Sequence, residues 1–267
     1  HAPLFQRTCE EAGLNKYLFE FANIREQCSW VHMKEPEKAT KKACDLIRMA
    51  VAKAELLEPQ EDVKVDVEPS ALIIGGGISG MTAALNLASQ GFEVYLVEKE
   101  KEIGGYLRKI DRMYQGKSAD EVIEPLIEKV KSNRNIVVMT ESTVKSVDGY
   151  IGNYEVVISK KDGETSMRLI GTIIVATGAT EYIPDGLYGY GEYEGVLTLT
   201  DFEKMCKEKG VPNIDSIVFI QCVGSRGQDK SYCSRICCTT GIKNALRIKE
   251  INKKAKVTIF YREITTY

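Results

Sequence analysis

Four cysteines near the end of the sequence have residue types and spacing that suit metal chemistry. They are Cys222, Cys233, Cys237 and Cys238, with the spacing C-x10-C-x3-C-C. Four thiolates can ligate either a tetrahedral zinc ion or a [4Fe–4S] cluster. Zinc sites usually contain two C-x2–4-C elements, and this segment does not have two. Two adjacent cysteines can also bind two corners of a cluster more easily than they can both ligate a single metal ion. The pattern therefore favours an iron–sulfur cluster over zinc.

A glycine-rich segment directly after the buried-strand pattern of residues 71–74 is the second candidate site. Gly75 permits a tight turn out of the strand, and Gly80 allows the following helix to pack closely on it. Gly77 has no side chain, so a pyrophosphate can approach the backbone at this position. The three glycines match the G-x-G-x-x-G pattern of a dinucleotide-binding turn.

The residues around this turn complete the predicted dinucleotide site. Ile78 and Ser79 lie within the turn and are assigned to the cofactor site, and the helix that follows the turn has free N–H groups that can bind phosphates. Glu98 and its neighbour Lys99 follow the next strand-like segment, residues 93–97. A carboxylate in this position can accept hydrogen bonds from ribose hydroxyls. An ordinary glycine-rich turn would not explain why strand, helix, second strand and acidic residue occur in this order.

Later features resemble the FAD-binding domains of flavoproteins with two dinucleotide-binding domains, such as the thioredoxin-reductase-like enzymes. These features are Gly104, Gly105, Val144, Ala176, Thr177 and Gly178. In that family the double glycine lies by the flavin part of the cofactor, and the Ala-Thr-Gly segment closes over it. Val144 lies at the position where members of that family contact the adenine. The resemblance implies that the cofactor is FAD.

The elements that would position these residues alternate between strands and helices. Predicted strands cover residues 71–74, 93–97, 135–139, 169–175, 216–221 and 257–261, and residues 143–160 form a predicted hairpin. Predicted helices run from the glycine turn to about residue 90 and over residues 118–132, 201–209 and 240–252. The alternation predicts an α/β fold with a parallel sheet. The resemblance narrows this to a Rossmann-like, thioredoxin-reductase-like flavoprotein with two dinucleotide-binding domains.

The sequence before residue 71 is helical in pattern, including residues 10–21 and 39–57. We therefore expect four parts. They are a helical N-terminal segment (residues 1–58), a linker (59–70), an FAD-binding domain (71–200), and the start of a second Rossmann-like domain that carries the cysteine loop (201–267). Residue 1 is His, and the last residues directly follow a strand-like run. We expect the sequence to be a piece of a longer polypeptide.

Composition excludes several classes of function. Lys plus Arg is 36 and Asp plus Glu is 38, so the chain has no excess of basic residues to bind nucleic acid or an anionic membrane. Two histidines leave no basis for a histidine cluster. No transmembrane span or signal peptide is visible, and we expect a cytoplasmic protein. In that compartment, eight cysteines indicate metal or redox chemistry and not a disulfide framework.

The strand before the cysteine loop lacks the features of a second nucleotide site. In flavoprotein reductases with two such domains, the corresponding strand opens a second glycine-rich loop that holds NAD(P)H. Here the strand continues into Cys222-Val-Gly-Ser-Arg226, and the next strand ends at Tyr261-Arg262 without an acidic residue. We therefore expect electron transfer between FAD and a cluster, without hydride transfer from NADH bound in this chain.

Longer motifs resemble the A subunit of heterodisulfide reductase, a family of FAD and iron–sulfur proteins from methanogens and other anaerobes. Besides the glycine fingerprint, they are Leu14-Asn-Lys-Tyr17, Ala22-Asn-Ile-Arg-Glu-Gln-Cys-Ser-Trp-Val-His32, Phe219-Ile-Gln-Cys-Val-Gly-Ser-Arg226 and Tyr232-Cys-Ser-Arg-Ile-Cys-Cys238. The resemblance covers nearly the whole chain. It implies FAD together with a [4Fe–4S] cluster on the four clustered cysteines.

The resemblance also implies a role and partners. In this family the A subunit handles electrons by flavin-based bifurcation, within a complex of B and C subunits and a hydrogenase or formate dehydrogenase. The CoB–CoM disulfide is reduced on the B subunit, and the A subunit usually dimerises. A family lysine near flavin N5 falls on Lys243, where a cation would stabilise the anionic reduced flavin. From the residues alone, a solvated helix lysine would be preferred.

The chain departs from the family pattern in two places. Family members commonly carry ferredoxin modules, one of them inserted between the hairpin and the Ala-Thr-Gly strand. Residues 160–172 of this chain are predicted to be a short connection without cysteine. The family also tends to have a C-x2-C element after the double glycine, which residues 114–121 lack. These departures indicate a shortened relative without an electron route through inserted clusters.

Two other functions stay open at this point. An NAD(P)H-dependent flavin disulfide reductase would need a redox-active C-x2-C or C-x4-C pair and a second glycine fingerprint. An FAD-binding scaffold would hold a structural zinc at the cysteine loop. Of the remaining cysteines, Cys28 lies in a family motif and is a candidate ligand of an N-terminal cluster. Cys9, Cys44 and Cys206 are predicted to be free or structural thiols.

Overall fold

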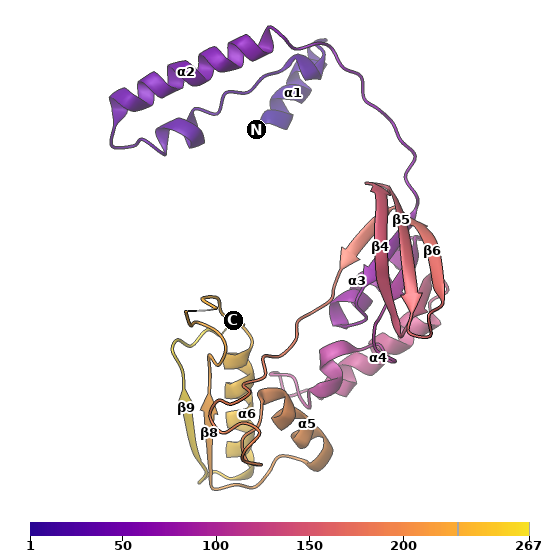
Figure 1. Ribbon diagram of the computed structural model, residues 1–267, viewed down its shortest axis with the longest axis vertical. Coiled ribbons are helices and arrows are strands. Elements are labelled where there is room, and N and C mark those ends of the chain that lie inside the picture. The colour runs from indigo at the N-terminus through magenta and orange to yellow at the C-terminus, as the bar shows by residue number, and fades with distance from the viewer. Residues whose placement is uncertain (229, 267) are drawn as a thin grey trace. The chain divides into compact units, whose positions relative to one another are not determined.

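The computed structural model describes residues 1–228 and 230–266, which divide into two compact units. The first unit is His1–Val65, and the second begins at Asp66. The boundary falls inside residues 59–70, where the linker is predicted. Figure 1 labels many of the helices and strands and colours the chain from its N-terminus to its C-terminus. The division into four parts stays a prediction.

The first unit consists of helices and turns. It contains α1 (Ala2–Glu11), the 3-10 turn η1 (Lys16–Leu18), the π-helical turn η2 (Arg25–Ser29) and α2 (Pro36–Ala54). The helix predicted over residues 10–21 is wrong. The chain leaves α1 at Gly13, which has a left-handed φ of +83°, and Asn15 then caps a separate turn by accepting a hydrogen bond from the Tyr17 N–H. The helix predicted over residues 39–57 is confirmed as α2.

A parallel sheet forms the centre of the second unit. Its strands are β1 (Ser70–Ile74), β2 (Glu93–Val97), β3 (Ile136–Met139) and β7 (Thr172–Val175), in the order β3-β2-β1-β7. Two helices, α3 (Ile78–Ser89) and α4 (Ala119–Ser132), connect β1 to β2 and β2 to β3. They bury one face of the sheet in an apolar core that includes Ile73, Leu96 and Ile123.

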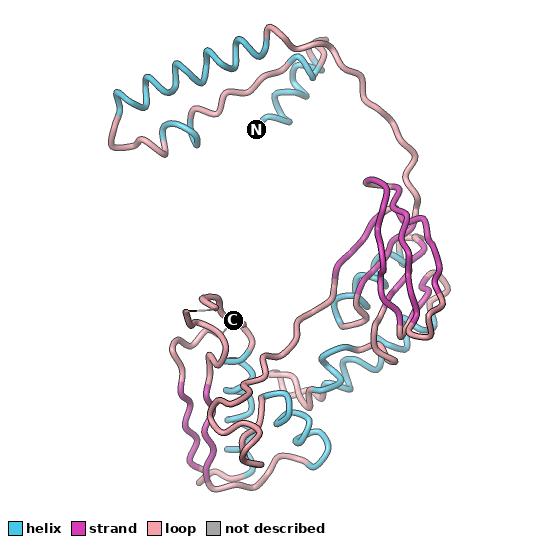
Figure 2. Tube along the Cα trace, viewed as in Figure 1, coloured by secondary structure: helices cyan, strands magenta, loops and turns pink. Residues whose placement is uncertain are grey.

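A three-stranded antiparallel meander covers the other face of the sheet. It consists of β4 (Ser142–Tyr150), β5 (Asn153–Lys160) and β6 (Thr165–Ile170), drawn in magenta in Figure 2. Leu72 of β1 packs there with Val156 and Ile170. Residues 160–172 therefore contain a strand, and their prediction as a plain connection is wrong.

The single buried strand predicted over residues 169–175 is also wrong. Gly171 separates β6 from β7, and a Cβ atom on Gly171 would lie 1.9 Å from the carbonyl oxygen of Glu68. This close approach of two backbone segments lets the chain leave the meander and enter the parallel sheet. β7 forms one edge of that sheet, and Val175 at its end is 70% exposed.

The remaining elements form a smaller α/β arrangement. They are α5 (Leu199–Lys209), β8 (Ser216–Ile220), α6 (Cys237–Ile251) and β9 (Lys256–Phe260), with β8 and β9 parallel. Their core includes Phe202, Phe219 and Ile248, and α6 covers the strand pair (Figure 1). α6 begins earlier than predicted, so Cys237 and Cys238 both lie in its first turn.

The parallel sheet with its flanking helices confirms the predicted α/β class. In the part of the chain that the structure describes, no helix combines the length and the apolar character needed to cross a membrane.

Truncation of Ile123 tests the larger core. Ile123 is fully buried between α4 and the sheet, so Ile123→Ala should lower the free energy of unfolding by about 2–5 kcal/mol through lost burial and a cavity. Urea unfolding followed by circular dichroism measures this. Ile151→Ala serves as the control because Ile151 is 83% exposed. Equal losses in both variants would contradict the core assignment.

Candidate cofactor site

The glycine turn lies at the edge where the parallel strands end. Ile74, Val97 and Val175 are paired in register, so the residues that follow them emerge side by side. The Gly75 N–H donates to the Val97 carbonyl at 2.8 Å, and the Ala176 N–H donates to the Ile74 carbonyl at 2.8 Å. Ligands of parallel α/β sheets bind at this carboxyl edge.

Gly75 and Gly80 are required by close backbone contacts. A Cβ atom on Gly80 would lie 1.9 Å from the Gly75 oxygen, and a Cβ atom on Gly75 would lie 2.3 Å from the Ala176 oxygen. Gly75 also has a φ of +111°, which residues with side chains rarely adopt. The strand-to-helix turn can therefore form only with glycine at these two positions.

The surroundings of Gly77 fit a phosphate-bearing cofactor. A Cβ atom on Gly77 would meet no protein atom within 4 Å, so close packing within the protein does not explain this glycine. No side chain caps the N-terminus of α3, and its first turn contains no acidic residue. Its N–H groups, including those of the exposed Ile78 and Ser79, can therefore bind an anion.

The double glycine packs against this turn. The Gly104 N–H donates to the Gly76 carbonyl at 2.7 Å, and a Cβ atom on Gly105 would lie 2.9 Å from the Gly77 Cα. Gly104 and Gly105 have φ values of +129° and +58°. The structure thus brings the two glycine motifs together, as a cofactor that spans both would require.

Glu98 braces the turn from the end of β2. Its side chain is buried, with Oε2 accepting the Gly76 N–H at 2.7 Å and Oε1 accepting the Glu100 N–H at 2.9 Å. Each carboxylate oxygen can accept a further hydrogen bond, so a ribose remains compatible. Sequence reasoning missed Gly76, although the run of three glycines contained it.

The other predicted cofactor residues lie in varied surroundings. Ala176 contacts the turn through its carbonyl, and Thr177 and Gly178 follow it as exposed residues. Lys99 is also exposed. Val144 lies at a bulge in β4 and joins the apolar cluster between the meander and the sheet. The roles assigned to these residues stay predictions.

Lys243 takes part in a buried charged network. Its Nζ lies 2.5 Å from Glu203 Oε1 and donates to the Arg112 carbonyl at 2.7 Å. Glu203 is buried, and its Oε2 accepts the Asp111 N–H at 3.1 Å. A second ion pair joins Arg247 of α6 to Asp111. The network links α5, α6 and the loop after the double glycine, and nothing in the sequence spacing indicated it.

The cysteine thiols gather around the segment after β9. Cys222 and Cys238 both direct their Sγ atoms toward the Glu263 carbonyl, at 4.0 and 3.9 Å. Burial raises the pKa of the Cys238 thiol, and the neighbouring Cys237 and Cys222 raise it further, whereas the Thr265 backbone N–H lowers it. The thiols of Cys237 and Cys222 are therefore both close enough to Cys238 to influence its pKa.

Cys233 also lies near this segment, since the Thr265 side chain influences its pKa. The Arg235 N–H donates to its Sγ at 3.2 Å and lowers the pKa of this thiol, as do the side chains of Arg226 and Thr265. Thr265 thus influences the pKa values of both Cys233 and Cys238. The donor set around residues 263–265 is rich in thiols, which suits an iron–sulfur cluster.

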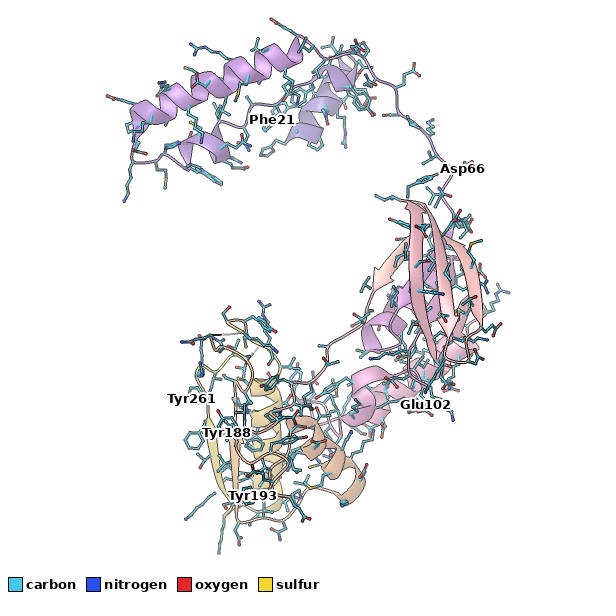
Figure 3. All side chains as sticks on the ribbon, viewed as in Figure 1. Phe21, Asp66, Glu102, Tyr188, Tyr193 and Tyr261 are labelled. Carbon is cyan, nitrogen blue, oxygen red and sulfur yellow. The ribbon has the colours of Figure 1, made fainter. Side chains whose placement is uncertain are left out.

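The loop is bent and covered by a tyrosine. Cys222, Arg226 and Arg235 have φ values of 62°, 53° and 63°, in the left-handed region. A Cβ atom on Gly224 would lie 2.4 Å from the ring of Tyr182, so this ring lies directly on the loop. Tyr182 belongs to the tyrosine-rich segment between β7 and α5, marked by Tyr188 and Tyr193 in Figure 3.

Within residues 1–228 and 230–266, no three Cys, His, Asp or Glu side chains form a group that could hold a metal ion. The other cysteines lie elsewhere. Cys28 is buried and its thiol donates to the Ala39 carbonyl at 2.8 Å, and Cys44 is exposed. Burial raises the pKa of Cys206 to about 11, as suits a structural thiol.

Gly77 and Gly80 form a matched pair for testing the turn. Gly80→Ala should unfold or strongly destabilise the protein because its Cβ has no room. Gly77→Ala should leave thermal stability of the FAD-free protein unchanged and weaken FAD binding at least tenfold, because its Cβ would point into the space for phosphate. Thermal melts and fluorescence titration with FAD measure these effects. Unchanged FAD affinity in Gly77→Ala would contradict the assigned site.

The buried network predicts a large stability effect at Glu203. Glu203→Gln leaves Lys243 without its counter-charge, so the free energy of unfolding should fall by about 3–5 kcal/mol. The double variant Glu203→Gln/Lys243→Met should recover part of this loss. Glu208→Gln, an exposed position on the same helix, is the control. Urea unfolding measures all three, and a Glu203→Gln loss no larger than that of Glu208→Gln would refute the ion pair.

Comparison with known proteins agrees with this geometry. Residues 69–220 match the family model described as pyridine nucleotide-disulphide oxidoreductase. The match includes the glycine turn, both sheets around it and β8, and it ends directly before Gln221 and Cys222. Membership of this flavoprotein family supports FAD as the cofactor.

Two curated relatives are similar over large parts of the chain. The A subunit of the H2:CoB-CoM heterodisulfide,ferredoxin reductase of Methanothermobacter marburgensis is 36% identical over 358 residues, covering 100% of this chain and 54% of its own length. That alignment is longer than the 267 residues of this chain, so the relative has residues within the matched region that lack a counterpart here. A protein of Archaeoglobus profundus that is named as similar to the A subunit of heterodisulfide reductase is 49% identical over 162 residues, covering 60% of this chain and 23% of its own.

Among solved structures, the L-proline dehydrogenase of P. horikoshii aligns with a TM-score of 0.46 at 20% identity, covering 75% of this chain and 37% of that one. This chain spans about half the length of the full-chain relative described above. The family match over 69–220 and the relatives confirm the resemblance stated from the motifs. The chain belongs to the pyridine nucleotide-disulphide oxidoreductase family, as an oxidoreductase related to the A subunit of heterodisulfide reductase.

Proposed function

We propose that this chain is an FAD- and [4Fe–4S]-dependent electron-transfer subunit of the heterodisulfide reductase A type. The observation that carries the proposal is that Cys222, Cys233 and Cys238 all lie near residues 263–265, with Cys237 next to Cys238 in the first turn of α6. FAD would exchange electrons in pairs or one at a time and the cluster only one at a time, which is the chemistry that the two groups supply when bound.

The glycine turn would hold the FAD. Gly77 and the first turn of α3 offer an open backbone surface with uncapped N–H groups to the pyrophosphate. Glu98 would accept hydrogen bonds from the ribose while it keeps the turn in shape. Gly104 and Gly105 contact the turn and would lie along the middle of the cofactor.

Lys243 would lie near the flavin ring, as the resemblance implies. The structure directs its ammonium group toward the loop that follows the double glycine, where it donates to the Arg112 carbonyl. A positive charge there would stabilise negative charge on the reduced flavin. Glu203 keeps this ammonium group in place.

The relatives supply the proposed context. The name of the M. marburgensis relative contains H2, ferredoxin and the CoB-CoM heterodisulfide. By analogy, this chain would pass electrons toward reduction of that disulfide on a B-type subunit, as a homodimer with C-type subunits and a hydrogenase or formate dehydrogenase. Bifurcation and the cytoplasmic location belong to the same proposal.

The experiment is an anaerobic visible absorption spectrum before and after dithionite, with iron and FAD analysis. Flavin bands near 450 nm with a broad shoulder near 400 nm, bleaching together, are expected for the proposed pair. Zinc in place of iron would favour the scaffold alternative. Reduction by NADPH without iron would favour a disulfide reductase. Either result would replace the proposal.

Cys237→Ala tests the ligand assignment. Loss of one of four thiolates should abolish the 400 nm shoulder and most of the iron while FAD stays bound, because the glycine turn is separate from α6. Cys44→Ala is the matched control, since this exposed cysteine lies in the first unit. Unchanged iron in Cys237→Ala would show that this cysteine is not a ligand.

A further inference from the structure

Arg226 joins the parts of the chain that surround the four thiols. Its guanidinium donates to Thr265 Oγ1 at 2.9 Å and forms an ion pair with Glu263. Its backbone N–H donates to the carbonyl of Tyr232 at 3.1 Å, and Tyr232 directly precedes Cys233. One residue therefore connects the segment after β9 to the part of the loop that carries Cys233.

The connection made by Arg226 includes Glu263, whose carbonyl lies beside two of the thiols. Cys222 and Cys238 both face that carbonyl, and the Glu263 side chain is fixed by Arg226. The carbonyl of Arg226 in turn accepts a hydrogen bond from the Arg262 guanidinium. The position of residues 262–265 among the thiols thus depends on Arg226 at several points.

One donor of Arg226 has no acceptor among the residues that the structure describes. Its Nε atom is buried and makes no hydrogen bond within the described residues. A buried donor of a charged group that lacks a partner destabilises the folded state, so its presence points to an acceptor bound beside it. Thiolate and sulfide sulfurs are acceptors of this kind, and the thiols are the nearby candidates.

We propose that Arg226 is a positioning residue of the four-cysteine centre, holding Cys233 and residues 263–265 around it and placing a positive charge beside its anionic sulfurs. The proposal rests on the iron–sulfur assignment in the proposed function. Net charge and hydrogen bonds to sulfur set the reduction potential of iron–sulfur clusters. A nearby positive charge favours the reduced state, which carries one more negative charge.

The test compares three variants of the full chain, purified anaerobically. Arg226→Gln removes the charge, Arg226→Lys keeps it, and Arg235→Gln removes a charge from an exposed position of the same loop. Iron per FAD is measured for each variant, and the midpoint potential is measured by titration followed with EPR and visible absorption. We expect a more negative potential in Arg226→Gln, a value closer to wild type in Arg226→Lys, and the wild-type potential in Arg235→Gln.

Each outcome tests either the role of Arg226 or the existence of the four-cysteine centre. If Arg226→Gln loses iron, retention of iron at a near wild-type potential in Arg226→Lys supports the role. An unchanged potential in an iron-loaded Arg226→Gln, an equal shift in Arg235→Gln, or loss of iron from both Arg226 variants would overturn it. Wild-type protein without iron would instead refute the four-cysteine centre itself.

Discussion

The contact between Gly80 and the carbonyl oxygen of Gly75 is the constraint on which the cofactor site depends. Because nothing larger than hydrogen fits between them, α3 starts directly above the end of β1. The start of α3 then fixes the direction of its free N–H groups and the open backbone at Gly77. Glu98 and Gly104 bind the remaining glycine of the turn, Gly76, from two sides. The parallel strands and the helices packed on them hold this short turn at the carboxyl edge of the sheet.

A second set of contacts links this domain to the cysteine-bearing helix. The ion pairs of Lys243 and Arg247 with Glu203 and Asp111 are largely withdrawn from water. Breaking either pair would leave an unpaired charge in a low-dielectric environment. The main effect of the two ion pairs is therefore to specify which residues contact each other here, and their net contribution to the free energy of unfolding is small. The loop that leaves the double glycine is thereby held against α6, whose first turn carries Cys237 and Cys238.

The sequence predicted those elements whose physical cause is local. The glycine turn, the helix after it and the strands of residues 93–97 and 216–221 follow from short patterns. The end of the first helix was missed because the apolar spacing of residues 10–21 continues past Gly13, although a glycine that adopts the left-handed conformation is itself a local signal for a helix end. The break at Gly171 depends on contact with Glu68, which is distant in sequence. The charged network and Arg226 depend on tertiary contacts, and only the motif around Cys222 drew attention to the latter.

The bent cysteine loop has a consequence for how the protein matures. Each left-handed residue other than glycine costs about 1–3 kcal/mol, and Cys222, Arg226 and Arg235 are all in this conformation. The loop keeps its shape through contacts at its borders, such as the Tyr182 ring on Gly224, and it contributes little to the apolar core behind α6. It can therefore open while both cores stay folded, since relaxation of its backbone offsets part of the lost contacts. Insertion of the proposed cluster would then follow folding of the chain as a separate step.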